Sequence, residues 1–62
     1  MSDLLELELR LLTVTQANSS DMAKAAGGNR AAITRVRKVM QTVKDIAQEI
    51  RVVALTVKPL GD

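Results

Sequence analysis

The chain has 62 residues, of which 47% are apolar, with nine basic and seven acidic groups and no aromatic residue, cysteine or histidine. Without cysteine or histidine it lacks a disulfide framework, the usual zinc ligands, a thiol nucleophile and an imidazole base, so we expect no enzyme, no metal and no cofactor. Such a short chain buries only about 60% of the surface that it exposes when unfolded, and we expect one small domain, residues 1–62, that folds by self-association.

The first predicted element is a helix from about residue 3 to residue 26. Leucine, glutamate and arginine, which dominate its first half, are good helix formers. The apolar residues at helical spacing are Leu4, Leu7, Leu11 and Val14. Apolar and charged residues also alternate here as in a strand, so a ribbon-helix fold with a strand at residues 4–12 is the alternative. The Asn-Ser-Ser sequence at residues 18–20 should weaken or kink the helix, because these side chains compete for backbone hydrogen bonds.

The apolar stretch near the start of the chain does not predict a membrane segment. Residues 4–12 are interrupted by Glu6, Glu8 and Arg10, and they fall short of the roughly 20 apolar residues that a membrane span needs. A basic segment and a small-residue cleavage site are also missing, so we predict no signal peptide. The expected location is cytoplasmic, with no membrane partner and no small-molecule substrate.

A Gly-Gly-Asn turn at residues 27–29 separates the two predicted helices. Its glycines favour termination of the first helix through a left-handed residue. Asn29 is a suitable N-cap for the second helix, since its side chain can accept a hydrogen bond from an amide of the first turn. The second helix is predicted from about residue 30 to residue 57, and Pro59 ends it.

The second helix has a wide apolar face. Its apolar residues occupy three positions per heptad rather than two, which suits a helix that packs against more than one neighbour. The predicted core of the oligomer consists of Ile33, Val36, Val39, Met40, Val43, Ile46, Ile50 and Val53. We therefore predict an all-α fold: a helical hairpin of two antiparallel helices with Leu4 opposite Val52, which pairs as a homodimeric four-helix bundle or antiparallel coiled coil.

Charges are separated along the chain. Residues 1–23 carry one basic and four acidic groups and residues 24–58 carry eight basic and two acidic ones, so a net charge of −3 stands against +6. Basic residues recur every seven positions in the second helix, with two more beside them: Arg30, Arg37, Lys44, Arg51 and Lys58, then Arg35 and Lys38. Either they cover the edge of the core and pair with Glu6, Glu8 or Asp21, or they contact nucleic-acid phosphates without reading bases.

The residues around the turn resemble a known family. Gly28-Asn29-Arg30-Ala31-Ala32, followed after two residues by Arg35-Val36-Arg37, is similar to the Gly-Asn-(Lys/Arg)-Ala-Ala-x-x-Arg-x-Arg signature of the bacterial linker-histone-like proteins, first known from Chlamydia. The resemblance covers about residues 22–52. It implies a helical-hairpin, nucleoid-associated protein that binds DNA, with matching basic positions at Arg30, Arg35, Arg37 and Arg51. The chain departs from the family pattern at two positions, where relatives have an aromatic residue and a lysine: Ile50 and Val52.

Three functions remain open from the sequence. The first is a histone-like protein that binds double-stranded DNA through the phosphates, using Arg30, Arg35, Arg37, Lys38, Lys44 and Arg51. The second is a structural or adaptor hairpin that mediates self-association or protein binding through its apolar end, residues 52–57. The third is Rop-like RNA binding by a helical bundle. The absence of aromatic residues argues against recognition of single-stranded nucleic acid.

Overall fold

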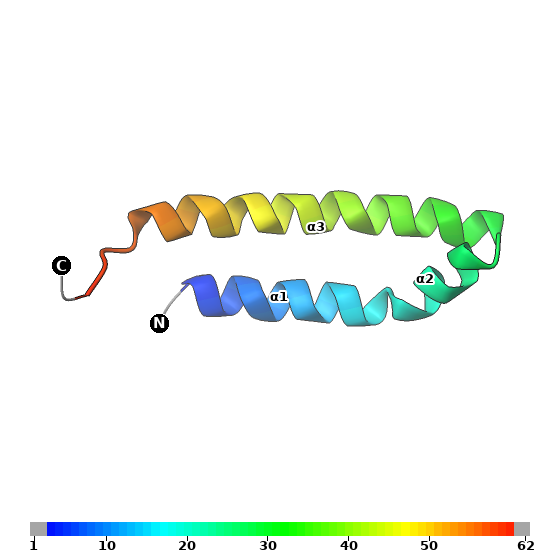
Figure 1. Cartoon of the computed structure of the whole chain (residues 1–62), viewed down its shortest axis with the longest axis horizontal. Coiled ribbons are helices and arrows are strands. Elements are labelled where there is room, and N and C mark those ends of the chain that lie inside the picture. The colour runs from blue at the N-terminus through cyan, green and yellow to red at the C-terminus, as the bar shows by residue number, and fades with distance from the viewer. Residues whose placement is uncertain (1–2, 61–62) are drawn as a thin grey trace.

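The computed structural model describes residues 3–60 and contains three helices there: α1 (Asp3–Ala17), α2 (Ser19–Ala26) and α3 (Arg30–Thr56) (Figure 1). The predicted all-helical class is confirmed for these residues. The alternative of a strand at residues 4–12 is wrong, because this segment lies in α1. Within the described part of the chain, no helix combines the length and the apolar content that a bilayer crossing requires.

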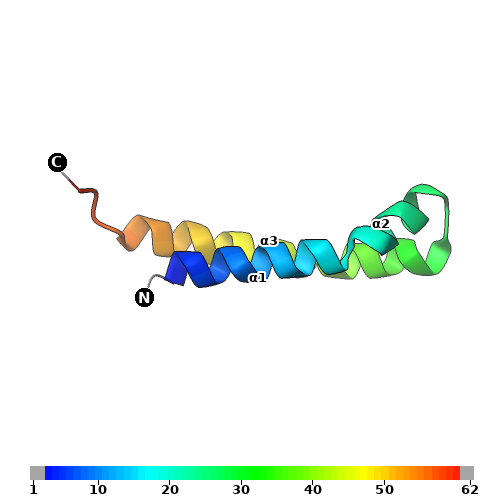
Figure 2. The same ribbon diagram turned by 90° about the horizontal axis from the view of Figure 1, so that it is seen from below.

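The first arm of the chain consists of two helices, α1 and α2, where we expected one helix weakened or kinked at residues 18–20. Asn18 lies between them, and its N–H donates to the carbonyls of both Val14 and Thr15 at 3.2 Å. The hydroxyl of Thr15 competes for the carbonyls of Leu11 and Leu12, at 2.9 and 3.1 Å. Such back-bonding bends helices, and Figure 2 shows α2 leaving the line of α1 at an angle.

In the turn between α2 and α3, backbone N–H groups cap the end of α2 and a side chain caps the start of α3. The N–H of Asn29 donates to the carbonyl of Lys24 and the N–H of Gly28 to that of Ala25, both at 3.0 Å, which is the Schellman pattern. Gly28 has a φ of 92°, a left-handed conformation that glycine adopts without steric cost. The predicted N-cap is confirmed, since Asn29 Oδ1 accepts from the N–H of Ala32 at 3.0 Å.

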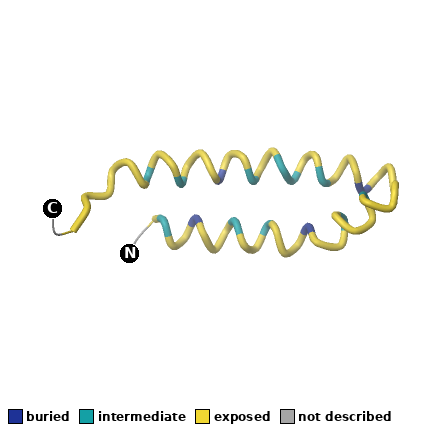
Figure 3. Tube along the Cα trace, viewed as in Figure 1, coloured by how far each residue is buried: buried dark blue, intermediate teal, exposed yellow. Residues whose placement is uncertain are grey.

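Because of this turn, α1 and α2 run back along one side of α3, antiparallel to it (Figure 1). Buried and half-buried residues follow the inner sides of both arms (Figure 3). All of them except Met40 follow one another at steps of three and four residues within each arm, as in a coiled coil, and we call this set the seam. The seam consists of Leu4, Leu7, Leu11, Val14, Asn18, Asp21 and Ala25 on the first arm and Ala32, Val36, Val39, Val43, Ile46, Ile50 and Val53 on α3.

Six of the eight residues predicted for the oligomer core lie in this seam and contribute to packing within the chain. The other two, Ile33 and Met40, lie beside it, with Ile33 exposed and Met40 half-buried. Ala32, which we did not predict, is completely buried. A role for these eight residues between copies of the chain stays a prediction.

The folded chain is a thin rod whose Cα atoms extend over 50 × 17 × 15 Å. Among the described residues, three apolar side chains are fully buried: Leu7, Ala32 and Ile46. Large apolar side chains that remain exposed include Leu5, Leu9, Leu12, Met22, Val52 and Leu55. The interior of one rod is therefore small, and much of its apolar surface faces solvent.

Candidate nucleic-acid interface

The basic surface of the molecule lies on α3. Every residue of this helix advances it by about 1.5 Å, so side chains seven positions apart lie in one row with a spacing of about 10 Å. We call the row of such cations the basic row, and it consists of Arg30, Arg37, Lys44 and Arg51, all exposed. From first to last it extends about 32 Å along the rod.

Lys58 does not continue the basic row, although the sequence spacing suggested that it would. The helix α3 ends at Thr56, and Val57 is extended with φ −79° and ψ 129°. Proline disfavours a helical conformation of the residue before it, so Pro59 keeps Lys58 out of the helix. The row therefore has four members.

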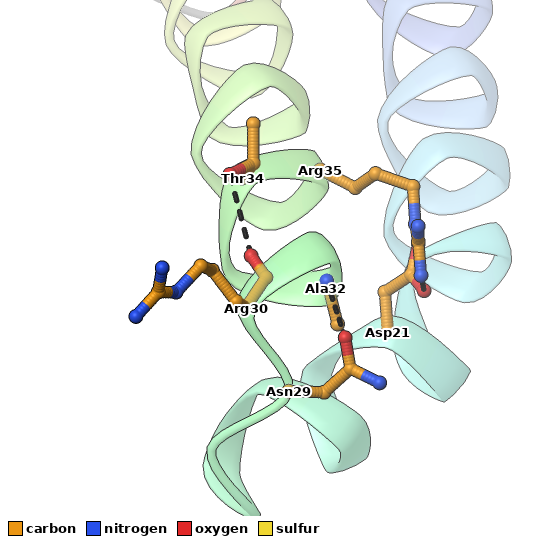
Figure 4. A network of polar contacts seen from close by, with 6 residues as sticks. All are labelled: Asp21, Asn29, Arg30, Ala32, Thr34 and Arg35. Carbon is orange, nitrogen blue, oxygen red and sulfur yellow. Dashed lines mark hydrogen bonds and ion pairs between the residues drawn. The ribbon is translucent and has the colours of Figure 1, made fainter.

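Arg35 lies on a different side of α3 and is held by a carboxylate of the first arm (Figure 4). Its Nε donates to Asp21 Oδ2 at 3.0 Å, and its second guanidinium nitrogen donates to Asp21 Oδ1 at 2.9 Å. This forked hydrogen bond lowers the pKa of Asp21 below its usual value and raises the pKa of Arg35. Figure 4 shows Arg30 pointing away from this pair, so Arg30 and Arg35 do not contribute to one cationic surface.

Lys38 lies next to the basic row on the outer surface of α3. It lines a shallow groove together with Thr34, Arg37 and Gln41. Residues three and four apart are neighbours on a helix surface, which places the charges of Arg37 and Lys38 on either side of this groove. With Lys38 beside the row, positive charge on this surface is densest along the first half of the row, near the turn.

The acidic side chains of α3 are directed to other partners. Glu49 pairs with Arg10 of α1 at 3.8 Å, and Asp45 accepts a hydrogen bond from Gln41 at 3.5 Å. Within residues 3–60, neither ion pair of the structure involves a member of the basic row. All four cations of the row are therefore free to meet an external anion.

The structure divides the six predicted nucleic-acid contacts into two groups. Four form the basic row and Lys38 adjoins it, whereas Arg35 is engaged with Asp21. Sequence reasoning named Asp21 as one of several acidic partners without choosing its cation. The expected antiparallel register, with Leu4 opposite Val52, would have identified the pair, because the same register places Asp21 opposite Arg35.

Over residues 3–60 these features define an elongated all-helical protein that displays, on one helix, a row of cations without ion pairs. Among the described residues, no group of three or more His, Cys, Asp or Glu side chains could hold a metal ion. The family model of the histone H1-like protein Hc1 matches residues 9–59, and the chain belongs to this family. The resemblance noted around the turn is thereby confirmed. Comparisons with curated proteins and with solved structures gave no significant match.

Proposed function

We propose that this protein is a small histone-like protein of the nucleoid, in the cytoplasm, that binds double-stranded DNA without base specificity. The observation that carries the proposal is the basic row of α3, four exposed cations that no carboxylate of the described residues neutralises. Membership of the histone H1-like family supports the same conclusion. Contacts to phosphates fix a protein on a duplex but carry no sequence information.

The length of the basic row is close to one turn of a DNA duplex. The row extends about 32 Å, and one turn of B-DNA rises about 34–36 Å. A rod laid along the duplex therefore meets both phosphate backbones within one turn. The cations are long, flexible side chains on one face of a straight helix, and the chain has no aromatic residue to stack on a base.

The remaining predicted contacts have different roles in this proposal. Lys38 adds a charge beside Arg37, on the groove that both line. Arg35 is held by two hydrogen bonds from its guanidinium to Asp21, so a phosphate must displace that carboxylate before Arg35 contributes. The first half of the row, near the turn, is thus the part that contacts DNA most strongly.

Self-association belongs to the proposal. The chain would act as a helical hairpin that pairs into a homodimeric bundle or a higher oligomer. Support comes from the small interior, with three fully buried apolar side chains among residues 3–60, and from the exposed leucines on α1. Domains of this size rarely supply enough core to be stable alone. Pairing would cover the exposed apolar surface and present more than one basic row to DNA.

The salt dependence of binding tests the DNA proposal. If four phosphates are neutralised, log affinity falls with log salt at a slope of about −3.6. Raising the salt from about 50 to about 200 mM should then weaken binding about 150-fold. Fluorescence anisotropy with two duplexes of unrelated sequence measures this, and we expect equal affinities. Failure to bind at the lower salt would contradict the proposal.

A matched pair of variants locates the contact. Changing both Arg30 and Arg37 to Ala should reduce the steepness of the slope by about 1.8, since each phosphate contact contributes about 0.9. Arg10→Ala is the control, because Arg10 is equally a surface cation but lies on α1. It should leave the slope unchanged. Because the first variant removes two charges and the control removes one, an effect of Arg10→Ala half as large as that of the double variant would show that net charge, rather than the basic row, controls binding.

An adaptor role is the second candidate, and one observation favours it. The end of the rod away from the turn exposes apolar side chains, among which Leu55 is 87% and Leu60 is 99% exposed. Exposed apolar patches mark interaction sites. A chain that fails to bind duplex DNA but retains its helical circular-dichroism spectrum would favour this function over the histone-like one.

A further inference from the structure

The two sides of the contact between α1 and α3 differ in their ion pairs. On one side, a groove is lined by Asp3, Glu6, Leu7, Arg10, Glu49 and Val53. The Arg10–Glu49 pair spans this groove at 3.8 Å. Arg35 precedes Glu49 by two heptads and so lies on the same side of α3, where it binds Asp21. Both ion pairs of the described residues thus lie on one side of the contact between the first arm and α3, which we call the paired side.

The opposite side, which we call the open side, is apolar. Its groove is lined by Leu4, Leu5, Glu8, Leu11 and Ile50. The seam residues that line it, Leu4, Leu11 and Ile50, are half-buried, as are Val36 and Val43 at steps of seven before Ile50. Along α3 the outer edge of the open side continues through small and apolar residues at heptad spacing: Ile33, Met40, Ala47 and Ala54.

We propose that a second copy of the chain docks on the open side, with both turns at the same end of the dimer. The inference rests on the self-association proposed above and adds its surface and its orientation. A face of about 50 by 17 Å offers about 850 Å² per copy, close to the roughly 800 Å² per partner that a standard interface buries. The exposed Leu5, Leu12 and Met22 then leave solvent.

Charge sets the orientation of the two copies. A two-fold axis along the rod places α3 of one copy against α1 of the other, and an axis across the rod places α3 against α3. The first arm is acidic and α3 is basic. Contact between two α3 helices would bring two basic rows side by side, because the row lies directly beside Ile33, Met40, Ala47 and Ala54. Like charges repel at such distances, so α3 packs against the first arm of its partner.

Glu8 acquires a partner in this arrangement. It is the charged residue among those lining the open groove, and it carries no ion pair within the described residues. The Arg10–Glu49 pair places Glu8 level with about residue 51 of α3. In the partner, Arg51 lies at this level. The small side chain of Ala47, one turn before Arg51, leaves room for the carboxylate between Arg51 and Lys44. Each copy thus supplies an anion to the far end of the other copy's basic row, and a phosphate must displace this carboxylate before Lys44 and Arg51 contact DNA.

Cross-linking tests the proposed face and orientation. The chain has no cysteine, so an introduced cysteine is the only thiol of its chain. A mixture of the Glu8→Cys and Ala47→Cys variants should form a heterodimer with a short bifunctional maleimide. The control is Glu49→Cys, whose position on the paired side is also exposed, and its mixture with Ala47→Cys should not react. Equal reaction of the control, or efficient self-cross-linking of a Met40→Cys variant, would overturn the orientation.

Charge reversal tests the role of Glu8. Glu8→Lys places a third cation beside Lys44 and Arg51 at each of the two equivalent sites, and we expect it to raise the dimer dissociation constant at least about tenfold. Adding Lys44→Glu and Arg51→Glu to this variant should restore the wild-type constant. Sedimentation equilibrium measures both. A wild-type mass equal to the 6.7 kDa monomer overturns this inference, even if the anisotropy titration shows DNA binding. A dimer that does not bind DNA contradicts only the proposed function.

Discussion

Asn18 is the polar member of the seam whose replacement should stabilise the protein most. The residue is 3% exposed and its Oδ1 accepts no hydrogen bond. A buried polar atom without a partner costs about 1–3 kcal/mol, and burial of a leucine in its place contributes about 1.5–3 kcal/mol. Leucine also favours a helical backbone by a few tenths of a kcal/mol over asparagine. Because the cavity must adapt to a new shape, we expect Asn18→Leu to gain about 2–3 kcal/mol.

The assay is thermal and urea unfolding followed by circular dichroism, with all variants at one protein concentration. For a domain of this size, a gain of about 2 kcal/mol raises the Tm by about 8–16 °C. Gln16→Leu is the control. It introduces the same side chain two residues earlier, at an exposed position of α1, where substitutions change stability by less than about 0.5 kcal/mol.

Two results would refute the reasoning about Asn18. Loss of stability in Asn18→Leu would mean that the carboxamide has a partner that compensates its burial. An equal gain in Gln16→Leu would assign the effect to helix propensity instead of the seam. A separate consequence is lower specificity, because a buried asparagine fixes register in coiled coils at a cost in stability. Asn18→Leu should therefore broaden the oligomer distribution measured by sedimentation.

Three further predictions concern the core, the turn and acid. Ile46 is 1% exposed, so Ile46→Ala should lower the free energy of unfolding by about 2–5 kcal/mol. We expect this as a loss of helical circular dichroism at room temperature. A change of less than about 0.5 kcal/mol would mean that Ile46 is not part of the core. The added Cβ of Gly28→Ala meets no atom within 4 Å, but the residue must keep a φ near 92°. The substitution should therefore lower the free energy of unfolding by about 1–2 kcal/mol, measured by urea titration. An unchanged midpoint would exclude a left-handed residue there. Arg35 lowers the pKa of Asp21 below the ordinary 3.8. Stability from this pair is therefore present above about pH 4 and is lost as the pH falls through the lower, folded-state pKa. Asp21→Asn should remove that part of the acid sensitivity, and a stability curve of unchanged shape below pH 4 would contradict it.

Local sequence signals predicted the helix ends well. The Gly-Gly-Asn turn and the N-cap at Asn29 depend on residues within five positions of each other, and this is the range over which capping chemistry operates. The weak point around residues 18–20 was expected for the same reason, although the structure limits the interruption to Asn18. Membership of the histone-like family was also visible in the residues after the turn.

The phase of the apolar face could not be predicted from hydrophobicity alone. Ile33 is more apolar than Ala32, so the sequence favoured Ile33 as the first core position. In the structure Ala32 is completely buried and Ile33 is 41% exposed, because the seam requires a small residue where the first arm turns into α3. The pairing of Arg35 with Asp21 is a different case, because the expected register places these two residues opposite each other, although they lie fourteen residues apart in the chain.

Asn29 serves both helices that meet at the turn, and this has a consequence for the order of folding. Its N–H ends α2 and its side chain begins α3, so the two helix ends form together or not at all. Closing a loop of a few residues costs little chain entropy compared with closing one of forty. We therefore expect the chain to fold like a zipper, with the turn as nucleus and the first turns of α1 docking last.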